Sequence, residues 1–241
     1  MVRTRGVKRA ILLAGGLGTR LHPFTVVIPK PLVPIGNLPI LEIIIRQLAA
    51  QGFDRVTLAV NHQADLLRAY FGDGSRWNIR IDSSLEPTPL GTMGPLKLIE
   101  DLPQDFLVMN GDILSDLNYA NFLEGHVDAR RLFTIAAAAR QQTIDYGVLQ
   151  IDDQEKLTGF EEKPKIPYIV SMGVYALSRA ALDWIPSNEP FGFDQLVLKM
   201  LAAQRAIKVV PHHGYWLDIG RPDDYQRAIE DWPKRGPAMG L

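Results

Sequence analysis

A glycine-rich turn directly behind an apolar run is the first feature of the chain that could do chemistry. The run 7–13 is followed by Gly15, Gly16 and Gly18, and then by Thr19. Because glycine has no Cβ, backbone N–H groups in such a turn can point toward an anion. The stretch therefore resembles a phosphate-binding loop.

Two cationic residues, Arg20 and Lys30, stand ten positions apart in the proline-rich segment behind this turn. Neither common fingerprint is complete, since a Walker loop needs Gly-Lys-Ser/Thr and a dinucleotide loop needs Gly-x-Gly-x-x-Gly at the start of a helix. Pro23 and the prolines of 29–34 also prevent a helix from starting here. A plain glycine-rich connection with exposed basic residues is the alternative to an anion site.

The elements that position this turn alternate along the first half of the chain. Apolar periodicity and stop signals predict strands at 7–13, 55–60, 78–85, 106–109 and 132–139, and helices at 38–51, 64–71 and 92–100. This alternation indicates an α/β fold with a Rossmann-like, mixed and mainly parallel sheet and helices on both faces. Ligands of such sheets lie beyond the carboxyl ends of the strands.

The second half of the chain predicts a small antiparallel addition to the sheet. A polar turn at 152–155 separates two short strands, and further elements follow. They are strands at 147–151, 156–160, 168–177 and 207–210, and helices at 180–185, 194–203 and 222–232. We expect one domain over residues 1–241, with its core at about 7–232 and a flexible tail at 233–241.

Composition limits the class of protein. The 241 residues are 46% hydrophobic and 22% charged with a net charge of -1, as in ordinary globular proteins. No basic excess exists to neutralise nucleic acid, and the absence of cysteine excludes disulfides and thiolate chemistry. The apolar stretch 10–14 is too short for a signal core, and no stretch of about 18 apolar residues occurs. We therefore expect a cytoplasmic protein without a nucleic-acid or membrane partner.

Several blocks in a fixed order carry a resemblance to a known family. They are LAGGLGTRLHPFT, PKPLVPIGNLPIL, LEPTPLGTMG (85–94), MNGD (109–112), DYGVL (145–149), FEEKP (160–164), SMGVYAL (171–177) and YWLDIGRPDDY (215–225). Together they resemble the sugar-phosphate nucleotidylyltransferases. Such enzymes convert a nucleoside triphosphate and a sugar 1-phosphate into a nucleotide sugar and pyrophosphate.

The resemblance implies a role for each of five charged residues. Arg20 matches the residue that contacts the departing pyrophosphate, and Lys30 matches the lysine that binds the phosphates of the triphosphate. Lys163 matches the lysine that holds the sugar 1-phosphate. Asp112 and Asp218 match the ligands of Mg²⁺, whose preference for carboxylate oxygen suits both.

The resemblance also implies residues that recognise the substrates. The nucleotide would be bound by Leu13, Gly15, Gly16, Gly18, Thr19, Gly91 and Thr92. The sugar would be bound by Gly147, Glu162 and Gly173. A structural reading stays open for the last three: Gly147 could start a hairpin, Glu162 could be an exposed carboxylate, and Gly173 could leave room inside a strand.

Within the family, LGTMG and YFGDGS (70–75) favour guanylyltransferases, with GTP and a mannose- or heptose-type sugar 1-phosphate as substrates. Uridylyl, thymidylyl or cytidylyl transfer to a hexose 1-phosphate stays open. So does a non-catalytic subunit that binds a nucleotide sugar, although the presence of all five charged residues favours an enzyme. A dinucleotide-dependent oxidoreductase is disfavoured, because the third glycine of its fingerprint is missing. A homo-oligomer is compatible with the sequence, which leaves the oligomeric state open.

Overall fold

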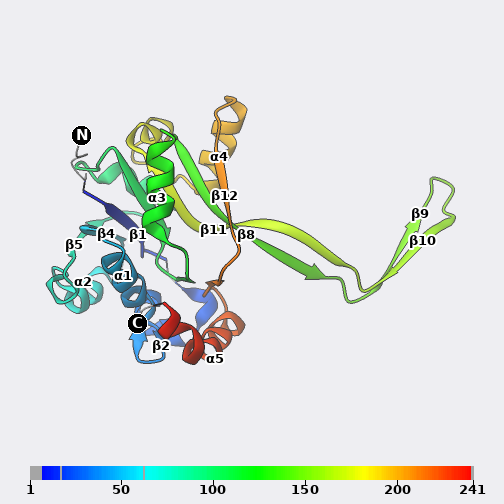
Figure 1. Ribbon diagram of the computed structural model, residues 1–241, viewed down its shortest axis with the longest axis horizontal. Coiled ribbons are helices and arrows are strands. Elements are labelled where there is room, and N and C mark those ends of the chain that lie inside the picture. The colour runs from blue at the N-terminus through cyan, green and yellow to red at the C-terminus, as the bar shows by residue number, and fades with distance from the viewer. Residues whose placement is uncertain (1–6, 17, 62, 240–241) are drawn as a thin grey trace.

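The computed structural model describes residues 7–16, 18–61 and 63–239, and these contain one seven-stranded sheet (Figure 1). From edge to edge its strands are β12 (Lys208–His212), β8 (Phe133–Thr143), β11 (Lys165–Ser178), β6 (Asp105–Asn110), β1 (Arg9–Leu13), β4 (Arg55–Val60) and β5 (Arg80–Leu85). Strand β11 is antiparallel to its neighbours β8 and β6, and the other neighbouring pairs are parallel. The predicted α/β class with a mixed, mainly parallel sheet is confirmed.

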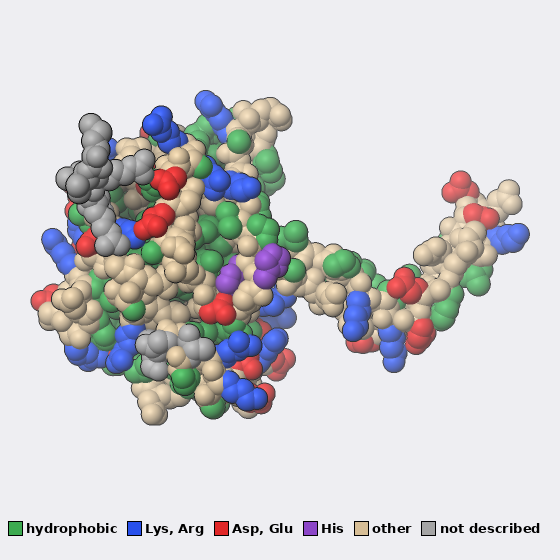
Figure 2. Space-filling view, viewed as in Figure 1, with side chains coloured by type: hydrophobic (Ala, Val, Ile, Leu, Met, Phe, Trp, Pro, Cys, Tyr) green, Lys and Arg blue, Asp and Glu red, His purple; other side chains and the backbone are tan. Residues whose placement is uncertain are grey.

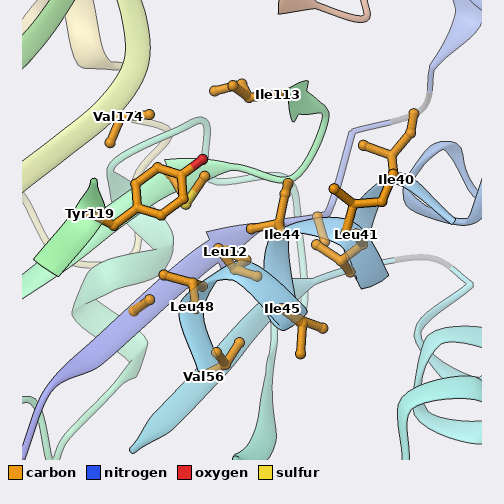
Figure 3. Packing of buried hydrophobic residues seen from close by; sticks show 14 of the residues in the cluster. Leu12, Ile40, Leu41, Ile44, Ile45, Leu48, Val56, Ile113, Tyr119 and Val174 are labelled. Atoms are coloured by element: carbon orange, nitrogen blue, oxygen red, sulfur yellow. The ribbon is translucent and has the colours of Figure 1, made fainter. Parts of the chain in front are cut away.

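Helices and short turns cover both faces of the sheet. The helices are α1 (Ile40–Ala50), α2 (Ala64–Phe71), α3 (Tyr119–Asp128), α4 (Phe193–Ala202) and α5 (Pro222–Ala238). Side chains alternate along the central strand β1 because successive residues of a strand point to opposite faces. Leu12 packs with α1, α2 and α3, whereas Ile11 packs on the other face in the cluster that includes α4. Figure 3 shows Leu12 surrounded by Ile44, Leu48 and Val56.

Three small antiparallel pairs complete the strands of the described chain. They are β7 (Ile113–Ser115) with β13 (Trp216–Asp218), β2 (Pro34–Ile35) with β3 (Leu38–Pro39), and β9 (Gly147–Ile151) with β10 (Leu157–Glu162). Of the helices that the structure describes, none is both long enough and apolar enough to cross a lipid bilayer.

Strands β8 and β11 run past the body of the protein as a two-stranded ribbon. The ladder continues outward from the pair Ala139 and Ile169 to the pair Thr143 and Lys165, and the β9–β10 hairpin lies at its far end (Figure 1). We call residues 139–170 the arm. The strand predicted at 132–139 ended too early and the one predicted at 168–177 began too late, because the ladder outside the body has no buried side chains to produce an apolar pattern.

Other segments also differ from the prediction, among them the predicted helix at 180–185, which is a 3-10 helix, Arg179–Trp184. The predicted helix at 92–100 is only a 3-10 turn, Gly94–Leu98, because Pro95 lacks an N–H and the amides of Met93 and Gly94 donate to the carbonyl of Phe191 instead. Strand β7 and helix α3 were not predicted. The side chain of Asn118 accepts a hydrogen bond from the Asn121 amide (2.8 Å) and caps α3.

Helix α5 continues beyond its predicted end at Trp232, through two prolines, to Ala238. Trp232 covers Gly36 so closely that no Cβ would fit there. The Arg235 guanidinium lies 4.9 Å from the centre of the Tyr215 ring. These contacts hold the segment in place, so the predicted flexible tail is helical as far as Ala238.

A pair of leucine substitutions tests this arrangement. Leu12→Ala removes a fully buried side chain from the centre of the sheet and should lower the free energy of unfolding by about 2–5 kcal/mol. Leu198→Ala, at a side chain of α4 that is 65% exposed, should change it by less than about 0.5 kcal/mol. Urea unfolding followed by circular dichroism measures both. Equal losses would show that Leu12 is not part of the core.

Candidate functional site

The glycine-rich turn lies where strands β1 and β6 end side by side. The Ala14 amide donates to the Ala59 carbonyl (2.8 Å), and the Gly111 amide donates to the Leu13 carbonyl (3.0 Å). Because β1, β4 and β6 are parallel, their carboxyl ends meet at one edge of the sheet. The turn after β1 is therefore held beside Gly111 and Asp112.

The proline-rich segment brings Lys30 back to this edge. Lys30 is buried, and its Nζ donates to Oδ2 of Asp112. Gly18 has a left-handed backbone (φ 64°), and a Cβ there would come within 3.0 Å of the Lys30 Cβ. The Thr25 hydroxyl donates to the Gly18 carbonyl (2.7 Å), which closes the loop on itself. Gly18 thus allows the loop to pack against the stem of Lys30.

Asp218 approaches Asp112 from the other direction. Strand β13 pairs with β7 so that Asp218 lies opposite Ile113, and the Ile219 amide donates to the Asp112 carbonyl (3.0 Å). Burial raises the pKa of the Asp218 carboxyl, and the negative charge of Asp112 raises it further. The charges of Lys30 and Arg20 oppose this rise. The two predicted metal ligands are therefore close enough to interact electrostatically.

These two carboxylates fit a divalent cation. The Oδ1 atom of Asp112 is buried and has no hydrogen-bond partner among the residues that the structure describes. Such an oxygen is expensive to bury unless something coordinates it. The described residues hold no group of three or more candidate ligands. Mg²⁺, however, usually takes only one or two protein carboxylates and fills its octahedron with phosphate oxygens and water.

The residues that are predicted to bind phosphate line a cavity of about 330 Å³. Gly16, Gly18, Thr19, Arg20, Lys30, Asp112 and Gly220 are among its lining residues. The Arg20 side chain lies against Gly220, where a Cβ would come within 3.3 Å of its Nη2. Backbone amides of the turn and two cationic side chains therefore surround a space lined also by Asp112, as phosphate binding requires.

A second cavity, of about 680 Å³, adjoins the first and shares Leu13, Gly16 and Asp112 with it. Its other lining residues include Gly15, Asn61, Glu86, Gly91, Thr92 and Asn110. Gly91 has a φ of 77°, and a Cβ there would come within 2.9 Å of the Phe191 carbonyl oxygen. The Thr92 hydroxyl accepts a hydrogen bond from the Phe193 amide (2.7 Å), so it also supports the start of α4.

Glu86 is a site residue that the sequence analysis missed. It is 8% exposed, its Oε2 accepts a hydrogen bond from the Leu90 amide (3.1 Å), and its Oε1 lies beside Gly15. Burial raises the pKa of its carboxyl. Its position directly after β5 was a usable signal, because the carboxyl ends of parallel strands line the ligand site.

The residues predicted to bind the sugar are divided between two places. Gly173 lies in β11 with a φ of 70°, and a Cβ there would come within 2.6 Å of Nδ2 of Asn110, which lines the larger cavity. Gly147, Glu162 and Lys163 lie in and next to the hairpin at the far end of the arm. Figures 1 and 2 show this hairpin standing clear of the body. The structure therefore brings together Arg20, Lys30, Asp112 and Asp218, but not Lys163.

Comparison with known proteins places these features in a family. The family described as Nucleotidyl transferase matches residues 9–235. The chain is 35% identical to a probable mannose-1-phosphate guanylyltransferase 1 of Oryza sativa, with 95% of this chain and 67% of that protein covered. It is 32% identical to a UTP--glucose-1-phosphate uridylyltransferase of Synechocystis, with 92% and 62% covered.

A solved structure resembles the chain along nearly its whole length. HddC from Yersinia pseudotuberculosis complexed with GMP-PN is 30% identical, with a TM-score of 0.70 and with 94% of this chain and 100% of that chain covered. The chain spans about two thirds of the length of the curated relatives named above, 67% and 62%.

The charge on Asp218 should destabilise the ligand-free protein. Because the pKa of Asp218 is higher in the folded state, the native protein binds more protons than the unfolded chain, and its free energy of unfolding falls as pH rises above about 4. Asp218→Asn removes this loss and should stabilise the protein at pH 7 by roughly 1 kcal/mol, with the gain disappearing near pH 4.

Urea unfolding with EDTA at both pH values measures this effect. Asp153→Asn, at an exposed carboxylate in the hairpin turn, is the control and should be neutral. A variant that is less stable than the parent at pH 7 would contradict the electrostatic account of Asp218.

Proposed function

Because the chain belongs to the Nucleotidyl transferase family, we propose that it transfers a guanylyl group from GTP to a sugar 1-phosphate of the mannose or heptose type. An oxygen of the sugar phosphate attacks the α-phosphorus, and the bond from that phosphorus to the bridging oxygen of pyrophosphate breaks. The products are a nucleotide sugar and pyrophosphate. No covalent intermediate with the protein is needed, so positioning and charge neutralisation are the tasks of the site.

The observation that carries the proposal is the cluster of Lys30, Asp112 and Asp218, in which Asp112 lines both cavities and Lys30 lines the smaller one. The smaller cavity offers glycine amides, Arg20 and Lys30 to the phosphates. Arg20 can bind two oxygens of the departing pyrophosphate, and the ammonium of Lys30 offsets charge that develops during transfer. The larger cavity then accommodates the nucleoside.

The family generally uses a divalent cation, and we assign Mg²⁺ to this chain. Asp112 and Asp218 would hold the ion, which would offset the negative charge of the triphosphate. Lys30 holds the Asp112 carboxylate in its orientation, because it contacts Oδ2 and leaves Oδ1 available. The identity of the cation as Mg²⁺ and the cytoplasmic location of the protein stay predictions.

Glu86 supports guanine as the base. Guanine presents two adjacent donors, N1–H and the exocyclic amine, and a carboxylate oxygen accepts such donors. Glu86 places one buried carboxylate in the larger cavity, fixed through the Leu90 amide. The uridylyltransferase relative keeps UTP as the second candidate, since one donor of uracil could also use this acceptor.

Pyrophosphate release tests the reaction and its substrates together. The protein is incubated with Mg²⁺, with each of GTP, UTP, dTTP and CTP, and with mannose, heptose, glucose or glucosamine 1-phosphate. We expect the highest kcat/KM for GTP with mannose or heptose 1-phosphate. Release with UTP and glucose 1-phosphate alone would select the second candidate, and no release from any pair would favour a non-catalytic nucleotide-sugar-binding subunit.

Loss of charge at the junction should reduce turnover. Arg20→Ala and Asp112→Asn should each lower kcat by at least about a hundredfold, because each removes a group that offsets or positions phosphate charge. Arg227→Ala is the matched control, since this arginine of α5 is 65% exposed and lines neither cavity. Steady-state kinetics with the best pair of substrates gives the values. Wild-type turnover by Asp112→Asn would refute its role in catalysis.

Glu86→Gln should weaken the preference for guanine. The amide keeps an acceptor for Leu90 but turns a donor toward the base, which should lower kcat/KM for GTP about 10- to 100-fold. Inosine triphosphate lacks the exocyclic amine, so the variant should also lose most discrimination between GTP and inosine triphosphate. Glu100→Gln, at an exposed carboxylate, serves as the control. Unchanged discrimination in Glu86→Gln would exclude Glu86 as the group that recognises guanine.

A further inference from the structure

The arm exposes a large amount of apolar surface. No residue from 139 to 170 is buried. Eight large apolar side chains of the arm are exposed: Tyr146, Leu149, Ile151, Leu157, Phe160, Ile166, Tyr168 and Ile169. A two-stranded ribbon is only marginally stable alone, and exposed apolar patches of this kind mark interaction surfaces.

One face of the hairpin combines this apolar surface with two residues that are predicted to bind the sugar. Leu149 lies opposite Phe160, and Gly147 lies opposite Glu162, in the antiparallel register. Directly opposed residues share a face, and so do residues two apart along a strand. A Cβ on Gly147 would touch the Phe160 ring and come within 3.1 Å of Glu162 Oε2, so these side chains lie together. Whatever covers the apolar face therefore also meets Glu162.

The arm cannot deliver Glu162 to its own cavities in this conformation. At its base, Arg140 donates to the Trp216 carbonyl (2.9 Å), and its guanidinium lies 4.4 Å from the centre of the Trp216 ring. The paired ladder then continues outward to Thr143 and Lys165. Figure 2 shows the end of the arm well separated from the body.

The body carries a second exposed apolar surface beside the phosphate residues. Phe24, Val26, Val27 and Ile28 are 51%, 61%, 74% and 43% exposed. They occupy the loop that joins Arg20 to Lys30, both of which line the smaller cavity. A chain with two uncovered apolar surfaces, one beside the phosphate site and one bearing Glu162, can bury both by pairing with a second copy.

We propose that two copies of this chain exchange arms, so that each hairpin covers the loop 24–28 of the other copy. Exchange brings Glu162 and Lys163 to the phosphate cavity of the second copy and completes its site for the sugar 1-phosphate. Reciprocal exchange gives a closed dimer with two-fold symmetry. The proposal rests on the proposed function, because it takes a sugar 1-phosphate as the substrate and uses the roles that the family resemblance implies for Glu162 and Lys163.

The mass of the protein in solution tests the exchange without any assay of activity. Light scattering after size-exclusion chromatography should show a dimer for the parent chain. The double variant Leu149→Ser/Phe160→Ser, and separately Val27→Asp, should be monomeric with unchanged circular dichroism. Gln150→Ser/Glu161→Ser alters the opposite face of the hairpin and should stay dimeric. A monomeric parent, or dimers that persist in both apolar variants, would overturn the proposal.

Mixing two inactive variants tests whether the site forms between copies. Glu162→Gln/Lys163→Gln damages only the arm, and Asp112→Asn damages only the body. Separately both should be inactive. After mixing and exchange, about a quarter of parental activity should return, since random pairing makes half of the dimers mixed and each mixed dimer has one intact site of two.

The two readouts separate this proposal from the proposed function. If the parent is dimeric through its arms but releases no pyrophosphate from any substrate pair, the proposed reaction fails and the exchange stands. If the parent is active but mixing restores nothing, the arm acts on its own chain and the exchange is refuted.

Discussion

Two carboxylates, Asp112 and Asp218, lie close enough at one edge of the sheet to interact electrostatically, and the ammonium of Lys30 contacts the first of them. Like charges that interact in this way oppose folding unless cations offset them. The charges of Lys30 and Arg20 offset part of the repulsion, and among the described residues Oδ1 of Asp112 has no hydrogen-bond partner. The arrangement is therefore under electrostatic stress in the ligand-free protein. A divalent cation with a triphosphate would relieve it, which links ligand binding directly to the stability of the site.

The rest of the fold serves to hold these three charges together. Parallel strands β1 and β6 bring the turn and Asp112 to the same edge, while β13 adds Asp218 through its pairing with β7. The proline-rich loop turns back within the ten residues from Arg20 to Lys30 and so places Lys30 beside Asp112. Gly18 permits the close approach of this loop to the Lys30 side chain. The same loop leaves Phe24, Val26, Val27 and Ile28 uncovered. The exposed apolar surface that we assign to a second copy thus follows from how Lys30 is positioned.

Sequence patterns predicted the features that depend on local periodicity and on short blocks. The turn after β1 and the alternation of the first half could be anticipated from the sequence pattern, whereas the grouping of Asp112, Asp218 and Lys30 followed only from the family resemblance, because Asp218 and Lys30 lie outside the parallel sheet. Helix α3 was missed, although Asn118 and the apolar residues behind it carried its signal. The arm could not be predicted, because its length depends on pairing between β8 and β11 rather than on burial. For the same reason, the blocks containing Glu162 and Lys163 did not reveal their distance from the other site residues.

The most direct test of the central claim is whether nucleotide binding stabilises the protein through the carboxylate pair and a divalent cation. Thermal unfolding is followed with a non-hydrolysable GTP analogue, with Mg²⁺, and with both, in the parent and in Asp218→Asn. In the parent, the account predicts that the GTP analogue and Mg²⁺ together raise Tm by more than the sum of their separate effects. In Asp218→Asn, it predicts that the combined rise equals that sum. An equal rise in the presence of EDTA, or an undiminished excess in the variant, would contradict it.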